Sequence, residues 1–464
     1  MLYDESAPER APTTAMIRAI AFYLPQVHPV PENDEWWGKG FTEWTNTMRA
    51  RPLFPGHYQP HVPADLGFYD LRVPEVREQQ AKLARAYGIH GFCYYHYWFS
   101  GKRLLERPFN EVLASGKPDF PFTLCWANEN WTRRWDGGEH QILVAQTHTD
   151  DNDRAFIREV IPAFRDRRYI RVNGRPLFLV YRTELFPDAH HTVRIWRDEC
   201  IKAGVGDPYL VRTESRVTGL DPKEHGFDAA YEFPPHGMPE GADVEPEDVF
   251  PQREGVDPSF TGTFWQYEVL ARGYLARKRP DYTLFRGNLV SWDNTPRRQG
   301  RGTVILDGTP ELYRYWLSKL VEDTRAWHAG DEQLVFINAW NEWAEGCHLE
   351  PDARFGHRWL EATRQALAQI EEPLLAEVAD VRRDPARAQE WIDRAAVRLA
   401  QQSDAVRGAV AELASTDKAR LEEIAKRRAE RRGGYRFVDR VYRVLDRLRG
   451  RASRDGLPPL PRSR

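Results

Sequence analysis

The chain has 464 residues, of which 12% are aromatic and 29% charged, and its formal net charge at pH 7 is −3. This length accommodates one large domain with an appendage, or two to three ordinary domains. The small net charge gives no basic field for nucleic acid, and no run of about eighteen apolar residues is present to form a transmembrane helix.

Residues 1–16 are acidic and contain proline, and they lack the charged start and apolar stretch of a signal peptide. We expect this segment to be disordered and the protein to be cytoplasmic. The four cysteines form no metal-ligand spacing and no disulfide framework, which fits a reducing compartment.

Eight short apolar runs rich in strand-forming residues recur along the chain, at 17–24, 90–99, 120–126, 176–181, 208–213, 227–233, 282–292 and 334–340. Helical patterns separate most of them, at 73–87, 104–114, 151–168, 191–203, 264–277 and 310–328, and another follows at 356–370. Strands that alternate with helices predict a parallel sheet, and eight such units predict an α/β fold of the (β/α)8 TIM barrel type over residues 17–371. The sixth unit is the weakest, because 234–262 has the pattern of a long loop. An open doubly wound sheet is the alternative, although no strand is followed by its glycine fingerprint.

Active-site residues of such barrels lie where strands end and the following loops begin. The predicted strand ends are rich in polar and aromatic residues, namely Tyr23, His96, Trp98, Asn128, Glu129, Trp131, Tyr181, Glu232 and Trp292. The loop at 29–70 adds Trp36, Trp37, Glu43 and Trp44. A loop this long is usually functional, although a structural flap over the barrel is equally compatible. We predict that these side chains bind an oligosaccharide or polysaccharide.

The eighth run leads directly into Asn341-Glu342-Trp343-Ala344-Glu345-Gly346. Hydrolysis of a glycosidic bond needs two carboxyl groups, and indole rings offer flat apolar faces to a sugar. We therefore predict Glu342 and Glu345 as catalytic residues, with Asn341 and Trp343 binding the substrate. The alternative is that this Glu-x-x-Glu pair is merely the solvated face of a helix.

The composition changes after residue 371, because Trp and Gly largely give way to Ala, Arg, Glu and Gln. Residues 372–432 have the pattern of a charged helical extension. We expect residues 433–464 to form a basic amphipathic helix followed by a disordered tail. This helix either docks on its own domain or another subunit, which is slightly favoured, or contacts an anionic membrane from the cytoplasmic side. The oligomeric state stays unknown.

Five segments, in order along the chain, resemble the WbsX-like proteins, which belong to a wider group similar to glycoside hydrolase family 99. They are Tyr23–Gln26, Asn33–Trp44, Tyr94–Trp98, Trp126–Trp131 and Asn338–Gly346, and the resemblance extends over about residues 17–370. It implies a (β/α)8 barrel and endo-α-mannosidase-like chemistry with retention of configuration. By this resemblance Glu342 would deprotonate the sugar 2-hydroxyl, whose oxygen then attacks the anomeric carbon to give a 1,2-anhydro sugar. Glu345 would protonate the departing oxygen and then take a proton from the acceptor.

These roles require a raised pKa for Glu345 and an ionised Glu342, which a hydrogen bond from an Asn amide would favour. We expect no metal and no cofactor. His57 and His61 are separated by Pro60, which argues against a helix that presents both, and the acidic run 150–153 has the pattern of a helix N-terminus rather than a transferase metal site.

WbsX-like members are usually linked with polysaccharide synthesis, such as that of O-antigen, and often carry a glycosyltransferase label. A glycosyltransferase that uses an activated sugar donor is therefore one alternative to a glycosidase or transglycosylase. A non-catalytic carbohydrate-binding scaffold is the other, and it is disfavoured because both glutamates are present.

Overall fold

The computed structural model describes residues 17–133, 138–237 and 253–368, apart from the side chains of 132–142. All of these belong to the first of two units into which the chain divides, Met1–Ile370. The predictions for residues 1–16 and 372–464 lie outside the described residues. Among the described helices, none has the length and apolar character needed to span a membrane.

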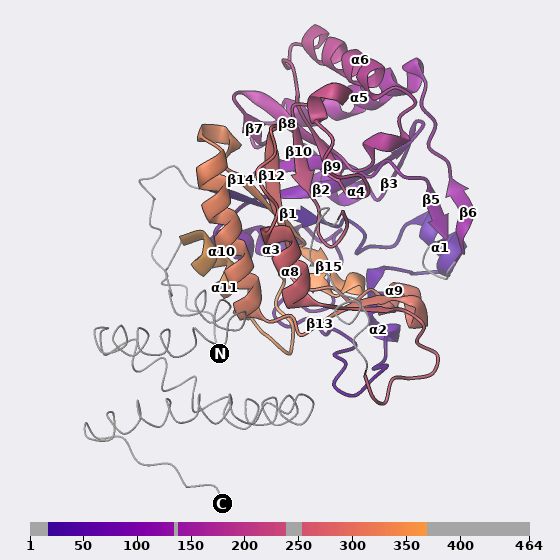
Figure 1. Ribbon diagram of the computed structural model, residues 1–464. Coiled ribbons are helices and arrows are strands. Elements are labelled where there is room, and N and C mark those ends of the chain that lie inside the picture. Colours follow the sequence, from indigo (N-terminus) through magenta and orange to yellow (C-terminus); the bar gives the residue numbers. More distant parts are fainter. Residues whose placement is uncertain (1–16, 134–137, 238–252, 369–464) are drawn as a thin grey trace, which may run out of the picture. The chain divides into compact units, whose positions relative to one another are not determined.

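Eight parallel strands close into a barrel, as predicted (Figure 1). In chain order they are β1 (Arg18–Tyr23), β2 (Ile89–Phe99), β4 (Phe122–Trp126), β8 (Arg175–Val180), β9 (Tyr209–Glu214), β10 (Ala229–Glu232), β12 (Leu284–Leu289) and β14 (Leu334–Asn338). Each pairs in parallel with the next, and β1 pairs with both β14 and β2, which closes the ring. All eight predicted runs are confirmed as barrel strands.

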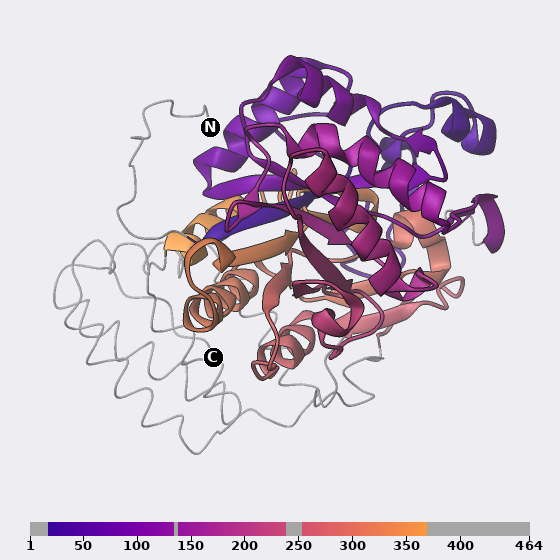
Figure 2. The ribbon, with the colours of Figure 1, turned by 90° about the horizontal axis from the view of Figure 1, so that it is seen from above.

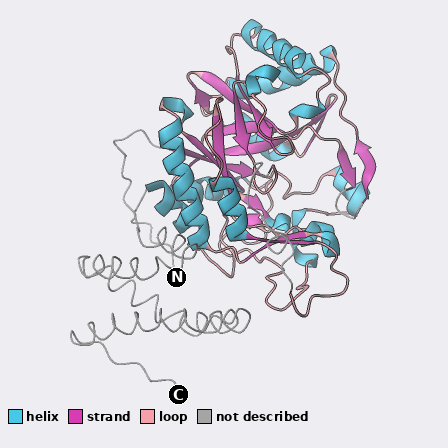
Figure 3. Ribbon diagram, viewed as in Figure 1, coloured by secondary structure: helices cyan, strands magenta, loops and turns pink. Residues whose placement is uncertain are grey.

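Helices surround the strands in both views (Figures 2 and 3). They are α3 (Pro74–Ala86), α4 (Arg107–Ser115), α5 (Asp150–Phe164), α6 (Ala189–Lys202), α8 (Tyr267–Leu275), α10 (Pro310–Trp327) and α11 (Arg358–Ala368). The connection from β9 to β10 carries only the short 3-10 helix η3 (Pro222–His225). Thr149 caps α5 by accepting a hydrogen bond from the Asn152 amide, which confirms that the acidic run at 150–153 is a helix N-terminus.

Short elements decorate the loops of the barrel. The strands among them are β3 (Lys102–Leu104), β5 (Trp131–Arg133), β6 (Gly138–Val144), β7 (Arg171–Val172), β11 (Thr263–Gln266), β13 (Thr303–Leu306), β15 (Asn341–Glu342) and β16 (Cys347–His348). The helices are α1 (Pro31–Trp37), α2 (Glu43–Arg49), α9 (Thr295–Arg298), η2 (Thr183–Leu185), η4 (Gln299–Arg301), η5 (Gly330–Glu332) and η6 (Trp343–Glu345).

Two expectations are corrected by these short elements. The connection at 29–70 contains the helices α1 and α2, each of 7 residues, which are too short to give a clear period in the sequence. The helical pattern at 264–277 begins as strand β11, because it pairs with β13.

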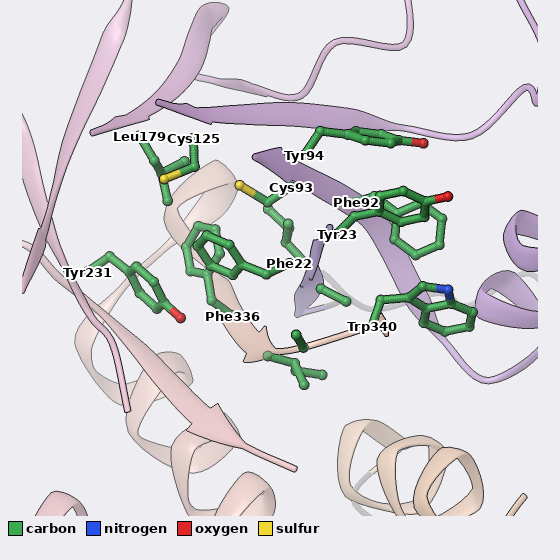
Figure 4. Close-up of a cluster of buried hydrophobic side chains, with 14 of the residues drawn as sticks. Phe22, Tyr23, Phe92, Cys93, Tyr94, Cys125, Leu179, Tyr231, Phe336 and Trp340 are labelled. Atoms are coloured by element: carbon green, nitrogen blue, oxygen red, sulfur yellow. The ribbon is translucent and has the colours of Figure 1, made fainter. Parts of the chain in front are cut away.

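Side chains of each barrel strand alternate between the barrel interior and the surrounding helices. Phe22 packs against Tyr231 and Phe336 inside the barrel, with ring centroids 5.4 and 6.1 Å away. Its neighbour Tyr23 points the other way, toward Phe92, and Figure 4 shows the two groups on opposite sides of β1. This alternation decides which residues of each strand can reach the barrel mouth.

Candidate active site

One guanidinium joins three glutamates at the ends of the barrel strands. Arg297 donates through Nη2 to Glu342 Oε2 at 2.7 Å and contacts Glu345 Oε1 through Nη1 at 2.6 Å. Its Nε donates to Glu43 Oε1 at 2.9 Å. Both predicted catalytic residues and one predicted binding residue therefore meet in a single ion cluster, hereafter the mouth cluster.

Three stretches of the chain bring the mouth cluster together. Glu43 begins α2 after β1, and Arg297 lies in α9 after β12. Glu342 ends β15 and Glu345 ends η6, both after β14. All follow the carboxyl ends of barrel strands, which is where TIM barrels place their chemistry.

The mouth cluster holds more negative than positive charge, and this shifts its protonation. Burial raises the pKa of Glu342 to about 8, against the opposing effect of Arg297 and with further raising by Glu345 and Glu43. Burial likewise raises the pKa of Glu43. Burial alone would lower the pKa of Arg297, but the three carboxylates raise it overall, so the guanidinium stays charged.

The side chain of Glu345 is 21% exposed and that of Glu342 only 7%. Glu345 is therefore the carboxyl that solvent and an incoming acceptor reach more easily.

The predicted source of the hydrogen bond to Glu342 is wrong. The Asn341 amide instead donates to the backbone carbonyl of Leu24 at 3.0 Å and accepts from the Leu24 amide at 2.8 Å. Asn341 therefore fastens the β15–β16 hairpin to the end of β1, while Arg297 supplies the donor to Glu342.

Two tyrosines missed by the sequence interpretation lie near these carboxylates. Tyr95 and Tyr97 are inward residues of β2, and their hydroxyl pKa values are raised first by burial and next by the charge of Glu342. The sequence interpretation chose His96 and Trp98 from the same strand. Those two side chains lie on the outer face, where both contact Phe156 of α5. The sequence gives no signal that separates the two pairs, because aromatic residues occupy both faces of β2.

The indole of Trp343 is held rigidly beside the cluster. It stacks on His348 with centroids 3.8 Å apart, and its Nε1 donates to Glu350 Oε2 at 2.7 Å. Trp44 lies 5.3 Å from it, and the Trp44 Nε1 donates to the Tyr69 carbonyl at 2.9 Å. Glu350, which the sequence interpretation did not include, thus holds an indole that is only 1% exposed, so Trp343 supports the site from beneath and does not offer the free face predicted for it.

A second aromatic group extends from Tyr97. Trp131 contacts Tyr97 at 5.2 Å and Trp36 at 6.3 Å between ring centroids. Trp37 contacts Phe41 at 6.0 Å at the end of α1. Trp36 and Trp131 therefore form one aromatic group with Tyr97, whereas Trp37 packs separately against Phe41.

Other predicted binding residues lie away from the mouth cluster. Tyr23 donates to Gln80 Oε1 of α3 at 2.7 Å, and Glu232 accepts from Arg286 Nε at 2.9 Å beneath α8. Both are outward strand residues, on the side opposite Phe22 and Tyr231. The structure does not bring them to the glutamates.

The remaining predicted residues secure the loops. Asn128 donates to the Arg182 carbonyl and accepts from its amide, both at 2.8 Å, and Glu129 pairs with the Arg182 guanidinium. Tyr181 contacts Phe233 at 5.4 Å, and Trp292 contacts His236 at 5.5 Å.

A groove of about 490 Å³ lies elsewhere, along α6 on the outside of the barrel, with Arg194, Arg197 and Asp207 among its lining residues. None of the predicted site residues lines it, and we place the candidate site at the barrel mouth because the paired carboxylates are there.

The fold and site define a (β/α)8 barrel with paired glutamates and aromatic rings at its mouth. The family model described as Glycosyltransferase WbsX matches residues 19–363. The chain therefore belongs to the WbsX glycosyltransferase family, a class of carbohydrate-active enzymes, and this confirms the resemblance found in the motifs.

The chain is 49% identical over 362 residues to the uncharacterized protein WxcX of Xanthomonas campestris pv. campestris (strain B100), a match that covers 78% of this chain. It spans about half of that relative, 50% of its length.

Among solved structures, a GH99 endo-alpha-mannosidase from Bacteroides thetaiotaomicron is 13% identical with a TM-score of 0.48, over 77% of this chain and 98% of that one. A glycoside hydrolase-like protein is 13% identical with a TM-score of 0.49, over 78% and 97%. Likenesses at this level assign neither fold nor activity, and the barrel is established by the strand pairing of this chain.

Proposed function

We propose that the barrel cleaves or transfers glycosyl units of a bacterial surface polysaccharide, with retention of configuration and with Glu342 and Glu345 as its catalytic pair. The observation that carries this proposal is the meeting of both carboxylates on Arg297 at the barrel mouth. Two carboxyl groups on either side of a scissile bond are what glycoside hydrolysis requires. An α-mannoside-like sugar follows from the family resemblance.

In the proposed reaction, Glu342 takes the proton of the sugar 2-hydroxyl. The hydroxyl oxygen bonds to the anomeric carbon as the glycosidic bond breaks, and Glu345 gives its proton to the departing oxygen. Water or an acceptor hydroxyl then opens the 1,2-anhydro sugar, returning one proton to Glu345 while the 2-oxygen recovers its own from Glu342. The pKa of about 8 contradicts the expectation that Glu342 is ionised at neutral pH, because burial leaves most of this group protonated at pH 7. The proposed proton removal therefore uses the ionised fraction, which grows as the pH approaches 8, and once ionised Glu342 is a stronger base than an ordinary carboxylate.

The charge of the mouth cluster supports a neutral sugar substrate. Only one guanidinium lies among the three carboxyl groups, so the mouth cluster offers little positive charge to a nucleotide diphosphate leaving group. The name of the matching family, Glycosyltransferase WbsX, keeps the glycosyltransferase as the second candidate, with an activated sugar donor in place of a polysaccharide.

The first test is a turnover assay with purified full-length protein. One arm contains α-mannoside oligosaccharides, the other nucleotide-sugars with a lipid-linked acceptor, and products are identified by mass spectrometry. The proposal expects cleavage or transfer without a nucleotide, and loss of it in Glu345→Gln. Sugar addition with nucleotide release would establish the transferase instead. Sugar binding without turnover in either arm would favour the non-catalytic scaffold.

Cytoplasmic location and membrane contact by residues 433–464 stay predictions.

A further inference from the structure

A cluster of three potential metal ligands lies at the β15–β16 hairpin, which carries Glu342 on its first strand. His61, His348 and Asp352 are all buried, and one ligand atom from each falls within 4.8 Å of the others. His61 Nδ1 is 2.8 Å from His348 Nε2, and His348 Nε2 is 3.9 Å from Asp352 Oδ2. The sequence interpretation expected no metal, because His61 was compared only with its near neighbour His57.

The ring of His348 is already oriented as a metal ligand. Its Nδ1 lies 2.9 Å from the Glu350 carbonyl, which can only accept, so Nδ1 carries the proton and donates. The neutral ring therefore directs the lone pair of Nε2 into the cluster. Metal-bound histidines almost always donate their second nitrogen to a carbonyl or carboxylate in this way.

The two carboxylate oxygens of Asp352 have different partners. Its Oδ1 accepts from the amides of Arg354 at 2.9 Å and Phe355 at 2.5 Å. These bonds fix the carboxylate plane, and Oδ2 is the atom that faces His348.

We propose that His61 Nδ1, His348 Nε2 and Asp352 Oδ2 bind a divalent first-row transition metal ion of the zinc type. Zinc bonds to imidazole nitrogen at about 2.0–2.1 Å, so two nitrogens on a tetrahedral ion lie roughly 3.4 Å apart. On binding, the distance between the two imidazole nitrogens would increase by about half an ångström, and the distance from His348 Nε2 to Asp352 Oδ2 would decrease by about half an ångström. His61 moves its proton from Nδ1 to Nε2, so no net proton is released. Water completes the coordination.

The ion would join two segments distant in sequence. His61 belongs to the segment 57–64, and His348 to β16, which pairs with the strand that carries Glu342. The backbone already connects the segments, since Ala353 donates to the Val62 carbonyl at 2.8 Å and Ala64 to that of Pro351 at 2.9 Å. The ring of His348 supports Trp343 by stacking. The ion therefore braces the hairpin from behind and takes no part in the proposed reaction.

The test uses the full chain without a polyhistidine tag, stripped with a chelator and then titrated with Co²⁺ under visible spectroscopy. We expect one equivalent to give d–d absorption that Zn²⁺ removes. His61→Gln keeps a hydrogen-bonding group and Asp352→Asn keeps the Oδ1 acceptor, so both retain the local hydrogen bonds. Each should weaken Co²⁺ binding at least about tenfold. The control His57→Gln alters the same segment outside the cluster and should retain the affinity of the original protein.

Thermal unfolding gives a second readout. Zn²⁺ should raise the melting temperature of the original protein and of His57→Gln, and leave that of His61→Gln unchanged. A third measurement needs no variant, because X-ray absorption of the zinc-loaded protein should show nitrogen and oxygen neighbours without sulfur. Absence of Co²⁺ binding, equal binding in the cluster variants, or sulfur ligation would each overturn the proposal and leave a hydrogen-bonded histidine pair.

Discussion

Two groups of buried ions in this barrel differ in their charge balance. In the mouth cluster, Arg297 alone faces three glutamates. On the outer face of the sheet, Arg286 and Arg277 face Glu232, with Nε–Oε2 and Nη1–Oε1 distances of 2.9 and 3.6 Å. Arg277 also pairs with Glu214 at 2.5 Å, and Arg286 with Asp323 of α10. Arg212 lies 3.7 Å from Glu214 and completes this second group, the outer network.

The outer network matches three carboxylates with three guanidiniums, whereas the mouth cluster has one guanidinium for the same number. Burying matched ions costs desolvation that their attraction largely offsets. Burial raises the pKa of Glu342 and also, despite its matched guanidiniums, that of Glu232. The two groups therefore differ in charge balance and not in the direction of their pKa shifts, and an unbalanced buried group is typical of a functional site. We predict that this difference separates glutamates that stabilise the fold from glutamates available for proton transfer, although both kinds lie at or after strand ends and look alike in sequence.

The largest expected effect concerns turnover. Glu345→Gln and Glu342→Gln should each lower kcat about 10²–10⁴-fold while sugar binding persists, because the shape remains and the proton transfer is lost. The matched control is Glu232→Gln in the outer network, which should keep its kcat per folded molecule. Measured kcat on the substrate found in the turnover assay decides this. Normal turnover in either Glu345→Gln or Glu342→Gln would show that this residue is not catalytic.

The next effect concerns stability, where a substitution in the outer network should matter more than one in the mouth cluster. Glu232→Gln leaves Arg286 short of a buried partner, and we expect it to lower the free energy of unfolding by about 3–5 kcal/mol. Asp70→Asn breaks an exposed pair with Arg72 at 2.7 Å and should cost less than about 1 kcal/mol. Urea unfolding measures both. A loss in Glu232→Gln no larger than in Asp70→Asn would show that the outer network does not stabilise the barrel.

The pH dependence of kcat/KM tests which role Glu342 has. If Glu342 is the base, activity rises as pH increases through about 8, the pKa to which burial raises this group. The charge of Arg297 lowers the pKa of Glu342 and so opposes the effect of burial. Arg297→Gln should therefore move the ascending limb of the pH profile to still higher pH. The same limb should be missing from the residual activity of Glu342→Gln. A limb that descends through pH 8 would instead make Glu342 the acid and exchange the proposed roles.

The sequence could predict the barrel because its signal is local and repeated. Eight runs of strand-forming residues separated by amphipathic helices leave few other topologies, and every run became a strand. Glu342 and Glu345 were found because they follow the last strand directly. Their shared partner was not, since Arg297 is 45 residues from Glu342 and only the closed ring brings them together.

Within strands, sequence alone could not establish which face is inward. Aromatic residues occupy both faces of β2, so hydrophobicity gives no alternation, and the outward His96 and Trp98 were chosen over the inward Tyr95 and Tyr97. Glu232 was misjudged for a related reason. A glutamate at a strand end predicts a site only if it points inward, and its buried partner Arg286 lies on a different strand, which no local pattern reveals.

The smallest expected effect again separates the two groups, through the sign of a stability change. The folded-state pKa of Glu342 is raised to about 8 from an ordinary value of 4.5, so between these values the native state holds more protons than the unfolded state. Stability from this group is present below pH 4.5 and is lost as pH rises through 8. Glu342→Gln still accepts from Arg297 but removes one charge from the acidic excess. We expect it to raise the melting temperature at pH 9 by roughly 2 °C, about 1 kcal/mol, with a smaller gain at pH 6. Glu232→Gln should lower the melting temperature at both pH values. Equal destabilisation by both substitutions would mean that the mouth cluster is a structural ion network like the outer one, and that its unbalanced charge marks no site.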